Sequence, residues 1–273
     1  MNNKLKAVVA LAILGAASQA HATIQPGTTG DGELFLSVWD DATKVSYTKD
    51  LGVTMSAFIG AGNNVAAVGT PMTINFSSDA NFTAFMTAAG GGASASWGIF
   101  ASDSTGAIAK DGQRYLSTSG NTLAQVKLQT NANVQSGFAN INNFLTSVNN
   151  TGTHATQADG SSFNVQATDP LSYAGSNPGS NWGGKAQTFT DSTVGLDSSM
   201  GFFYITPGST LPTGKVSAYQ FGNAVGAGTW TMSSTGSLAY SVPAVSAVPV
   251  PAALWLLGSA MVGLVGVARR KVA

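Results

Sequence analysis

Apolar and polar residues alternate in several short runs through the middle of the chain, a period-two pattern that predicts β-strands. The first two runs, 33–39 and 44–48, flank the turn-forming residues Asp40 and Asp41 and predict a β-hairpin. Further strands are expected at 52–59, 93–101, 163–167, 200–206, 215–221, 228–232 and 237–242. This set of short strands predicts a mainly β, β-sandwich-like domain.

One segment of this domain, residues 122–149, shows the period of a helix instead. Its large apolar residues recur at steps of three and four and form one stripe, made of Val134, Phe138, Ile141, Leu145 and Val148. The other face is mostly Asn, Ser and Thr, which are poor helix formers, so the helix must be held by packing. We expect one substantial helix there that covers a sheet. A shorter helix is expected at 78–89, capped by Ser77 or Ser78.

The first 22 residues have the layout of a secretory signal peptide. Lys4 and Lys6 give a positive start, residues 7–17 are apolar, and Ala20 and Ala22 form the small-x-small cleavage motif. We therefore expect export through the secretory translocon, cleavage by signal peptidase and a mature chain that begins at Thr23.

The last residues of the sequence form a second unusual segment. Residues 252–268 carry no charge, and as a helix they would be about 26 Å long, the short end of what spans a bilayer core. The basic residues 269–271 follow this stretch, and prolines punctuate the linker 243–251 before it. We expect a single C-terminal transmembrane helix whose basic end stays in the cytoplasm. A helix buried in a globular core and a permanent anchor are the alternatives.

The run VPVPAALWLLGSAMVGLVGVARRK at this end resembles the PEP-CTERM sorting signal of Gram-negative bacteria. That signal combines a Pro-x-Pro motif, a short hydrophobic helix and a basic end. Val250 stands where the family's name-giving Glu would be, as in VPxPA-type variants. The positions that carry the resemblance are Val248, Pro249, Val250, Pro251, Arg269, Arg270 and Lys271.

The resemblance implies a fate for the protein and says little of the middle domain. It implies a transient stay in the inner membrane, recognition by an exosortase and cleavage near the Pro-x-Pro motif. The product would be released or attached at the cell surface, usually in organisms that make exopolysaccharide, biofilm or flocs. The expected organisation is a signal peptide at 1–22, an exported domain at 23–242, a linker at 243–251 and the sorting helix with its basic tail at 252–273.

Charge and cysteine content narrow the function further. Five of the 12 basic residues lie in the two end segments, which leaves seven basic against 12 acidic residues, a net charge of −5, for the exported domain. Such a surface lacks the basic footprint of a nucleic-acid-binding protein. The chain has no cysteine, which excludes disulfides, thiol nucleophiles and cysteine metal sites.

Catalytic and metal-binding chemistry finds little support in the sequence, and we assign it no catalytic, cofactor-binding or metal-binding residue. His154 is the only histidine after the signal peptide and is expected to lie exposed in a polar loop. A glycosidase carboxylate pair could come from Glu33, Asp40, Asp41 or other acidic residues, and Glu33 is the single glutamate of the sequence. Calcium remains an alternative because several aspartates, Asp40, Asp41, Asp103, Asp159 and Asp169, are expected in loops.

The expected function is thus non-enzymatic, a structural or adhesive role in the extracellular polysaccharide matrix. A carbohydrate-binding module is the first alternative and a secreted hydrolase the second. Trp97 and Trp230 alternate with polar neighbours and are expected in the core, whereas Trp182 lies among Asn and Gly. Trp182 is therefore our sequence-based hypothesis for a sugar-stacking residue.

This hypothesis predicts that Trp182→Ala weakens retention of the protein on the polysaccharide of its own host, because an indole face supplies stacking area that alanine lacks. Retention can be measured by co-sedimentation with the purified polymer. Unchanged retention would remove Trp182 from the binding surface.

Overall fold

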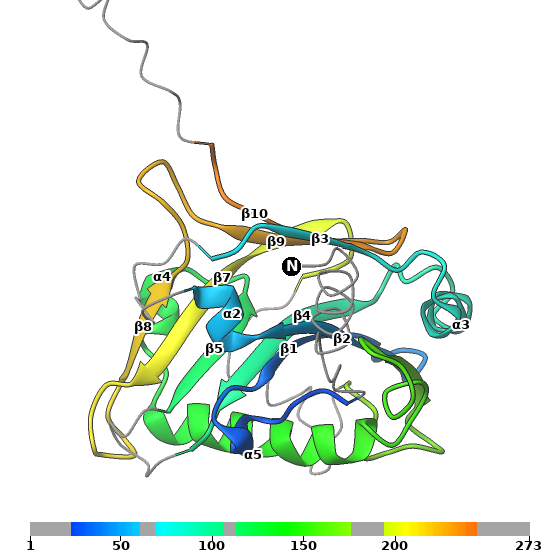
Figure 1. Ribbon diagram of the computed structural model, residues 1–273, viewed down its shortest axis with the longest axis horizontal. Coiled ribbons are helices and arrows are strands. Elements are labelled where there is room, and N and C mark those ends of the chain that lie inside the picture. The colour runs from blue at the N-terminus through cyan, green and yellow to red at the C-terminus, as the bar shows by residue number, and fades with distance from the viewer. Residues whose placement is uncertain (1–22, 61–68, 106–112, 176–193, 245–273) are drawn as a thin grey trace, which may run out of the picture. The chain divides into compact units, whose positions relative to one another are not determined.

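The computed structural model describes residues 23–60, 69–105, 113–175 and 194–244 (Figure 1). These residues are mainly β, as the sequence predicts. The strands are β1 (Glu33–Asp40), β2 (Val45–Thr54), β3 (Met72–Asn75), β4 (Ser96–Asp103), β5 (Arg114–Ser119), β6 (Ser161–Val165), β7 (Ser198–Pro207), β8 (Val216–Gln220), β9 (Thr229–Ser233) and β10 (Ser237–Ser241). The helices are the 3-10 turn η1 (Gly27–Thr29), α2 (Met55–Ile59), α3 (Ala80–Ala88), α4 (Leu123–Val126) and α5 (Asn131–Val148).

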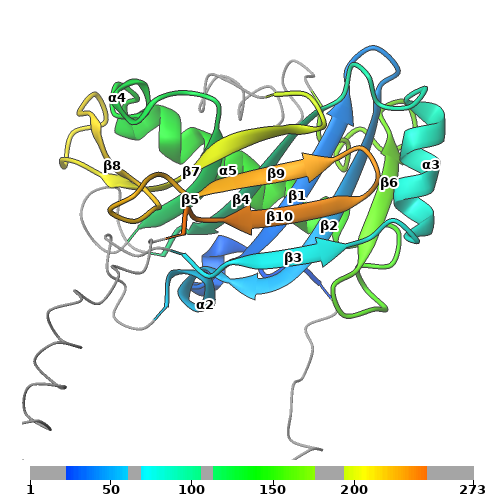
Figure 2. The same ribbon diagram turned by 90° about the horizontal axis from the view of Figure 1, so that it is seen from above.

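All the strands belong to one antiparallel sheet, in the order β3-β10-β9-β7-β5-β4-β1-β2-β6. Strand β8 lies outside this order and pairs with the last residues of β7. The first residues of β7 pair with β9. The sheet curls, so that β3, β9 and β10 lie over β1, β2 and β4 (Figures 1 and 2). The predicted sandwich is therefore corrected: its two β layers are parts of a single sheet, because β7 is long enough to pair with strands of both.

The apolar core lies on both sides of β1. Residues of one parity along this strand, such as Leu34 and Leu36, join the cluster enclosed by the curled sheet, which also holds Trp230 and Tyr240. Residues of the other parity, such as Phe35, join the cluster on the outer face. Successive side chains of a strand point to opposite faces, and here both faces are apolar and all eight residues of β1 are buried.

Helix α5 covers the outer face, and its predicted stripe is confirmed: Val134, Phe138, Ile141, Leu145 and Val148 are all buried (Figure 1). Phe138 stacks on Tyr115 of β5 with 4.1 Å between ring centroids. The predicted single helix at 122–149 is divided, however, into α4 and α5. The reason is local, because Thr122 and Thr130 each cap a separate helix and the Gln129 carbonyl between them accepts a hydrogen bond from Val216 of β8.

The remaining elements confirm some sequence predictions and correct others. The first hairpin, the strand near 163–167 and the strands after residue 198 are present. The strand predicted at 52–59 is wrong, because β2 ends at Thr54, whose hydroxyl caps α2. Asp79, rather than Ser77 or Ser78, caps α3. Strands β3 and β5 were not predicted, since their short sequences carry a weak apolar signal.

The two end segments of the chain fall largely outside the description. Contacts divide the chain into two compact units, Met1–Pro243 and Ala244–Ala273. The predicted signal peptide and the predicted transmembrane stretch 252–268 lie outside the described residues. Among the helices that are described, none is both long and apolar enough to cross a membrane.

The packing of α5 predicts the effect of truncating its central side chain. Phe138→Ala should lower the free energy of unfolding by about 3–5 kcal/mol, because the buried ring is lost and a cavity is left. Leu128→Ala, at a side chain that is 64% exposed, is the matched control and should change it by less than about 0.5 kcal/mol. Urea unfolding of the two variants measures both. Equal effects would contradict the assignment of α5 as the cover of the sheet.

Candidate functional site

A polar cleft of about 380 Å³ opens where β2, β6 and the start of α3 meet. Helix α3 lies beside β6 at the edge of the sheet (Figure 2). The polar side chains that line the cleft come from three distant parts of the sequence: Lys49; Asn75, Ser78, Asp79 and Asn81; and Thr153, Gln157, Asp159 and Ser161. The cleft therefore exists only in the folded chain.

The Asp79 carboxylate organises one wall of the cleft. It accepts hydrogen bonds from the Tyr47 hydroxyl and the Ser161 hydroxyl, each at 3.0 Å. It also accepts the Asn81 backbone N–H at 2.9 Å, as the N-cap of α3. The Asn81 amide in turn donates to the carbonyl and hydroxyl oxygens of Ser161. Strand β2, strand β6 and helix α3 are thus fixed to one another through one carboxylate.

Lys49 and Asp159 form the charged mouth of the cleft. The Lys49 ammonium donates to the Asp159 carbonyl. Burial lowers the pKa of Lys49, and the charges of Asp79 and Asp159 oppose that effect. Asp159 has a positive φ of 52°, and its carboxylate lies against Gly52, which also has a positive φ and where a side chain would collide with it. The glycine allows the two loops to approach closely.

His154 lies behind this cleft and is buried, which corrects the prediction of an exposed loop histidine. Burial, together with the charge of Lys49, lowers its pKa to about 4, so the imidazole is neutral at pH 7. The Thr48 backbone is near enough to act on the ring, but neither ring nitrogen makes a hydrogen bond of acceptable geometry. A serine-hydrolase role for His154 would need access that this burial does not provide.

Glu33 meets a different carboxyl group from the ones expected. Asp40 is seven residues further along the same strand, roughly 23 Å away at 3.3 Å per residue, whereas glycosidase carboxyls lie about 5–10 Å apart. The neighbour of Glu33 is instead Asp50 of β2. Burial, and then the charge of Glu33, raise the pKa of Asp50 to about 7. Glu33 is 8% exposed and Asp50 1%, so a substrate would have little access to the pair.

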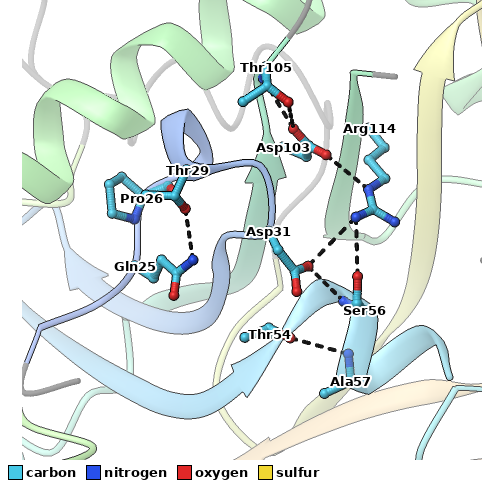
Figure 3. A network of polar contacts seen from close by, with 10 residues as sticks. All are labelled: Gln25, Pro26, Thr29, Asp31, Thr54, Ser56, Ala57, Asp103, Thr105 and Arg114. Carbon is cyan, nitrogen blue, oxygen red and sulfur yellow. Dashed lines mark hydrogen bonds and ion pairs between the residues drawn. The ribbon is translucent and has the colours of Figure 1, made fainter. Parts of the chain in front are cut away.

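A second polar network surrounds Arg114 at the start of β5 (Figure 3). Its guanidinium donates to Asp103 at 3.2 Å and to the Ser56 hydroxyl at 3.2 Å, and lies 3.7 Å from Asp31. Asp31 also accepts the Ser56 N–H at the start of α2. Since its side chain is only 12% exposed, Arg114 is best explained as an internal tie between β4, β5 and α2.

Four of the five aspartates considered for calcium make other contacts, and the fifth, Asp159, lines the cleft. Asp41 accepts the Tyr173 hydroxyl, and Asp169 accepts the Thr168 hydroxyl. The Asp40 carboxylate accepts the N–H groups of Ala42 and Thr43, and Asp103 pairs with Arg114. Within the described ranges, no three His, Asp or Glu side chains are placed to share a metal ion.

The other residues singled out from the sequence are placed as follows. Trp97 and Trp230 are buried in the core, as predicted. Thr23 is the first described residue, and the next one, Ile24, is buried and exchanges two hydrogen bonds with the Asn149 side chain. Trp182, the cleavage residues Ala20 and Ala22, and the sorting positions Val248 to Pro251 and Arg269 to Lys271 lie outside the described residues.

The cleft was not predicted. The polar residues that line the cleft come from strands, loops and the start of a helix, and they lie far apart in the sequence. No sequence motif links them. The one local signal is the Ser-Ser-Asp run before α3, which marks a helix start but not a site. Comparison of the chain with protein-family models, with curated proteins and with solved structures gave no significant match.

The buried side chains of Asp50 and His154 have pKa values shifted in opposite directions, which predicts that each changes the free energy of unfolding with pH. Asp50 has a raised pKa, so its contribution to stability is present at low pH and is lost as pH rises from about 4 to about 7. His154 has a lowered pKa, so its contribution is lost as pH falls from about 6.5 to about 4. The two slopes oppose each other, each by at most about 1.4 kcal/mol per pH unit.

We therefore expect Asp50→Asn to gain stability relative to wild type as pH rises from 4 to 7. We expect His154→Gln to gain relative to wild type as pH falls from 6.5 to 4. Urea unfolding across this pH range measures both differences, and differences that do not vary with pH would contradict the two shifts.

Proposed function

We propose that this chain is an exported, non-enzymatic surface protein that an exosortase processes, with a structural or adhesive role in the extracellular polysaccharide matrix. The observation that carries the proposal is the three-part C-terminal tail, in which a Pro-x-Pro motif, an uncharged helix-length stretch and a basic end follow one another. This arrangement suits sorting at a membrane, because an uncharged stretch of this length can span a bilayer core and a basic end resists translocation.

The boundaries of the folded unit support this proposal. Among the described residues, Ile24 is the first buried one and lies just after the expected signal-peptidase site, and the last strand ends at Ser241, just before the proline-containing linker. The compact unit ends at Pro243. The buried apolar residues of the described structure run from Ile24 to Tyr240, so cleavage after Ala22 and near Pro251 would remove none of them.

A carbohydrate-binding module is the second candidate, and the polar cleft beside α3 favours it. The cleft presents carboxylate, amide and hydroxyl groups together on a rigid wall, which is the set of groups that a polyhydroxylated ligand needs. The two candidates are compatible, because a matrix protein can hold its polymer through such a site.

The proposal is tested by intact mass and fractionation of the protein from its own host, with and without the host's exosortase. We expect an extracellular species that starts at Thr23 and ends near Pro251, and we expect the exosortase mutant to retain a longer, membrane-bound form. Pro249→Ala with Pro251→Ala should block processing, while Pro243→Ala in the same linker is the matched control. Recovery of the chain through Ala273 in the membrane of the normal host would overturn exosortase sorting.

A further inference from the structure

The mouth of the cleft holds polar groups that the fold itself does not use. No hydrogen bond joins the side chain of Gln157, the hydroxyl of Ser78 or the carboxylate of Asp159 to another described residue, although all three line the cleft. Gln157, Ser78 and Asp159 are exposed. The Lys49 ammonium has three N–H donors, and one of them donates to the backbone carbonyl of Asp159. These groups are available to a ligand.

The wall behind them is rigid. The Asp79 carboxylate accepts hydrogen bonds from four donors, and its bonds to Tyr47 and Ser161 join residues that are 32 and 82 positions away in the sequence. A site whose supporting groups are already fixed loses less conformational entropy when a ligand binds. The cleft is thus preorganised and has free groups at its mouth.

The charges of the cleft select the class of ligand. Two carboxylates, Asp79 and Asp159, face one ammonium, Lys49, which leaves one net negative charge. An anionic ligand such as a uronate, sulfate or phosphate would be repelled. Hydroxyl groups both donate and accept hydrogen bonds, so an uncharged polyol matches a mixture of carboxylate, amide and ammonium groups. Phe76 lines the cleft but is only 3% exposed, so polar contacts rather than ring stacking must carry the binding.

We propose that the cleft between β2, β6 and the start of α3 binds an uncharged sugar unit of a polysaccharide through Lys49, Gln157 and Asp159. The volume of about 380 Å³ falls in the range of small-ligand sites. The identification of the polymer as the matrix of the host rests on the proposed function, whereas the preference for an uncharged sugar rests on the cleft alone.

Titration calorimetry of the full-length protein in detergent tests the site. The probes are hexasaccharides of β-glucan, galactan and N-acetylglucosamine, and a hexauronate as the charged counterpart. We expect binding of at least one neutral probe and weaker or no binding of the uronate. Gln157→Ala and Asp159→Asn should each lower the affinity for the neutral probe about tenfold, which is the effect of losing one hydrogen bond. The lost bond is neutral for Gln157 and charge-assisted for Asp159. Asparagine tolerates the positive φ of residue 159, so this variant should fold.

Matched controls lie a few residues away on the same part of the chain. Gln166→Ala and Asp169→Asn make the same chemical changes outside the cleft and should leave binding unchanged. Asp159→Asn should also reduce the ratio of the affinity for the neutral probe to the affinity for the uronate, because it removes one negative charge from the cleft. A merely structural role of Asp159 would not change this ratio.

Three results would overturn the inference: no neutral probe binds, the uronate binds more tightly, or the cleft variants behave like the controls. The proposed function is judged separately. If the protein is processed and extracellular but binds none of these sugars, the sugar site is refuted and the sorting proposal stands. If it binds a neutral sugar but remains uncleaved in the membrane, the sorting proposal is refuted and the sugar site stands.

Discussion

The burial of β1 on both of its faces is the constraint on which the rest of the structure depends. This strand pairs with β2 along one edge and with β4 along the other, so its backbone hydrogen bonds are made within the sheet. Its side chains then supply two apolar faces at once, and each needs its own cover. The curl of the sheet covers one face, and α5 covers the other (Figure 1).

A strand buried in this way carries polar residues inward, and the structure satisfies most of them locally. Ser37 of β1 shares a hydrogen bond of 3.1 Å with Thr48 of β2 inside the sheet. Arg114 neutralises carboxylates at one end of the core. Asp50 and His154 are instead placed where burial disfavours their charged forms, so the interior holds neutral groups near pH 6.

The cleft follows from the way in which α3 is attached to the sheet. A helix N-cap usually serves only its own first turn, but the Asp79 carboxylate also receives the hydroxyls of Tyr47 and Ser161. The same bonds that hold α3 against β2 and β6 therefore bring Lys49 and Asp159 to a common opening. Structural attachment and the proposed binding site share one carboxylate.

The amino-acid sequence by itself determined the local features of this protein, because the apolar periods of helices and strands involve residues that lie close together along the chain. The first hairpin, the buried stripe of α5 and the mainly β class were predicted in this way. Only the tertiary structure decided that the strands form one curled sheet, that His154 is buried, that Glu33 meets Asp50 rather than Asp40, and that a polar cleft exists. Each of these depends on contacts between distant segments, whose pairing is settled by the packing of the whole domain and leaves no pattern in any one stretch of the sequence.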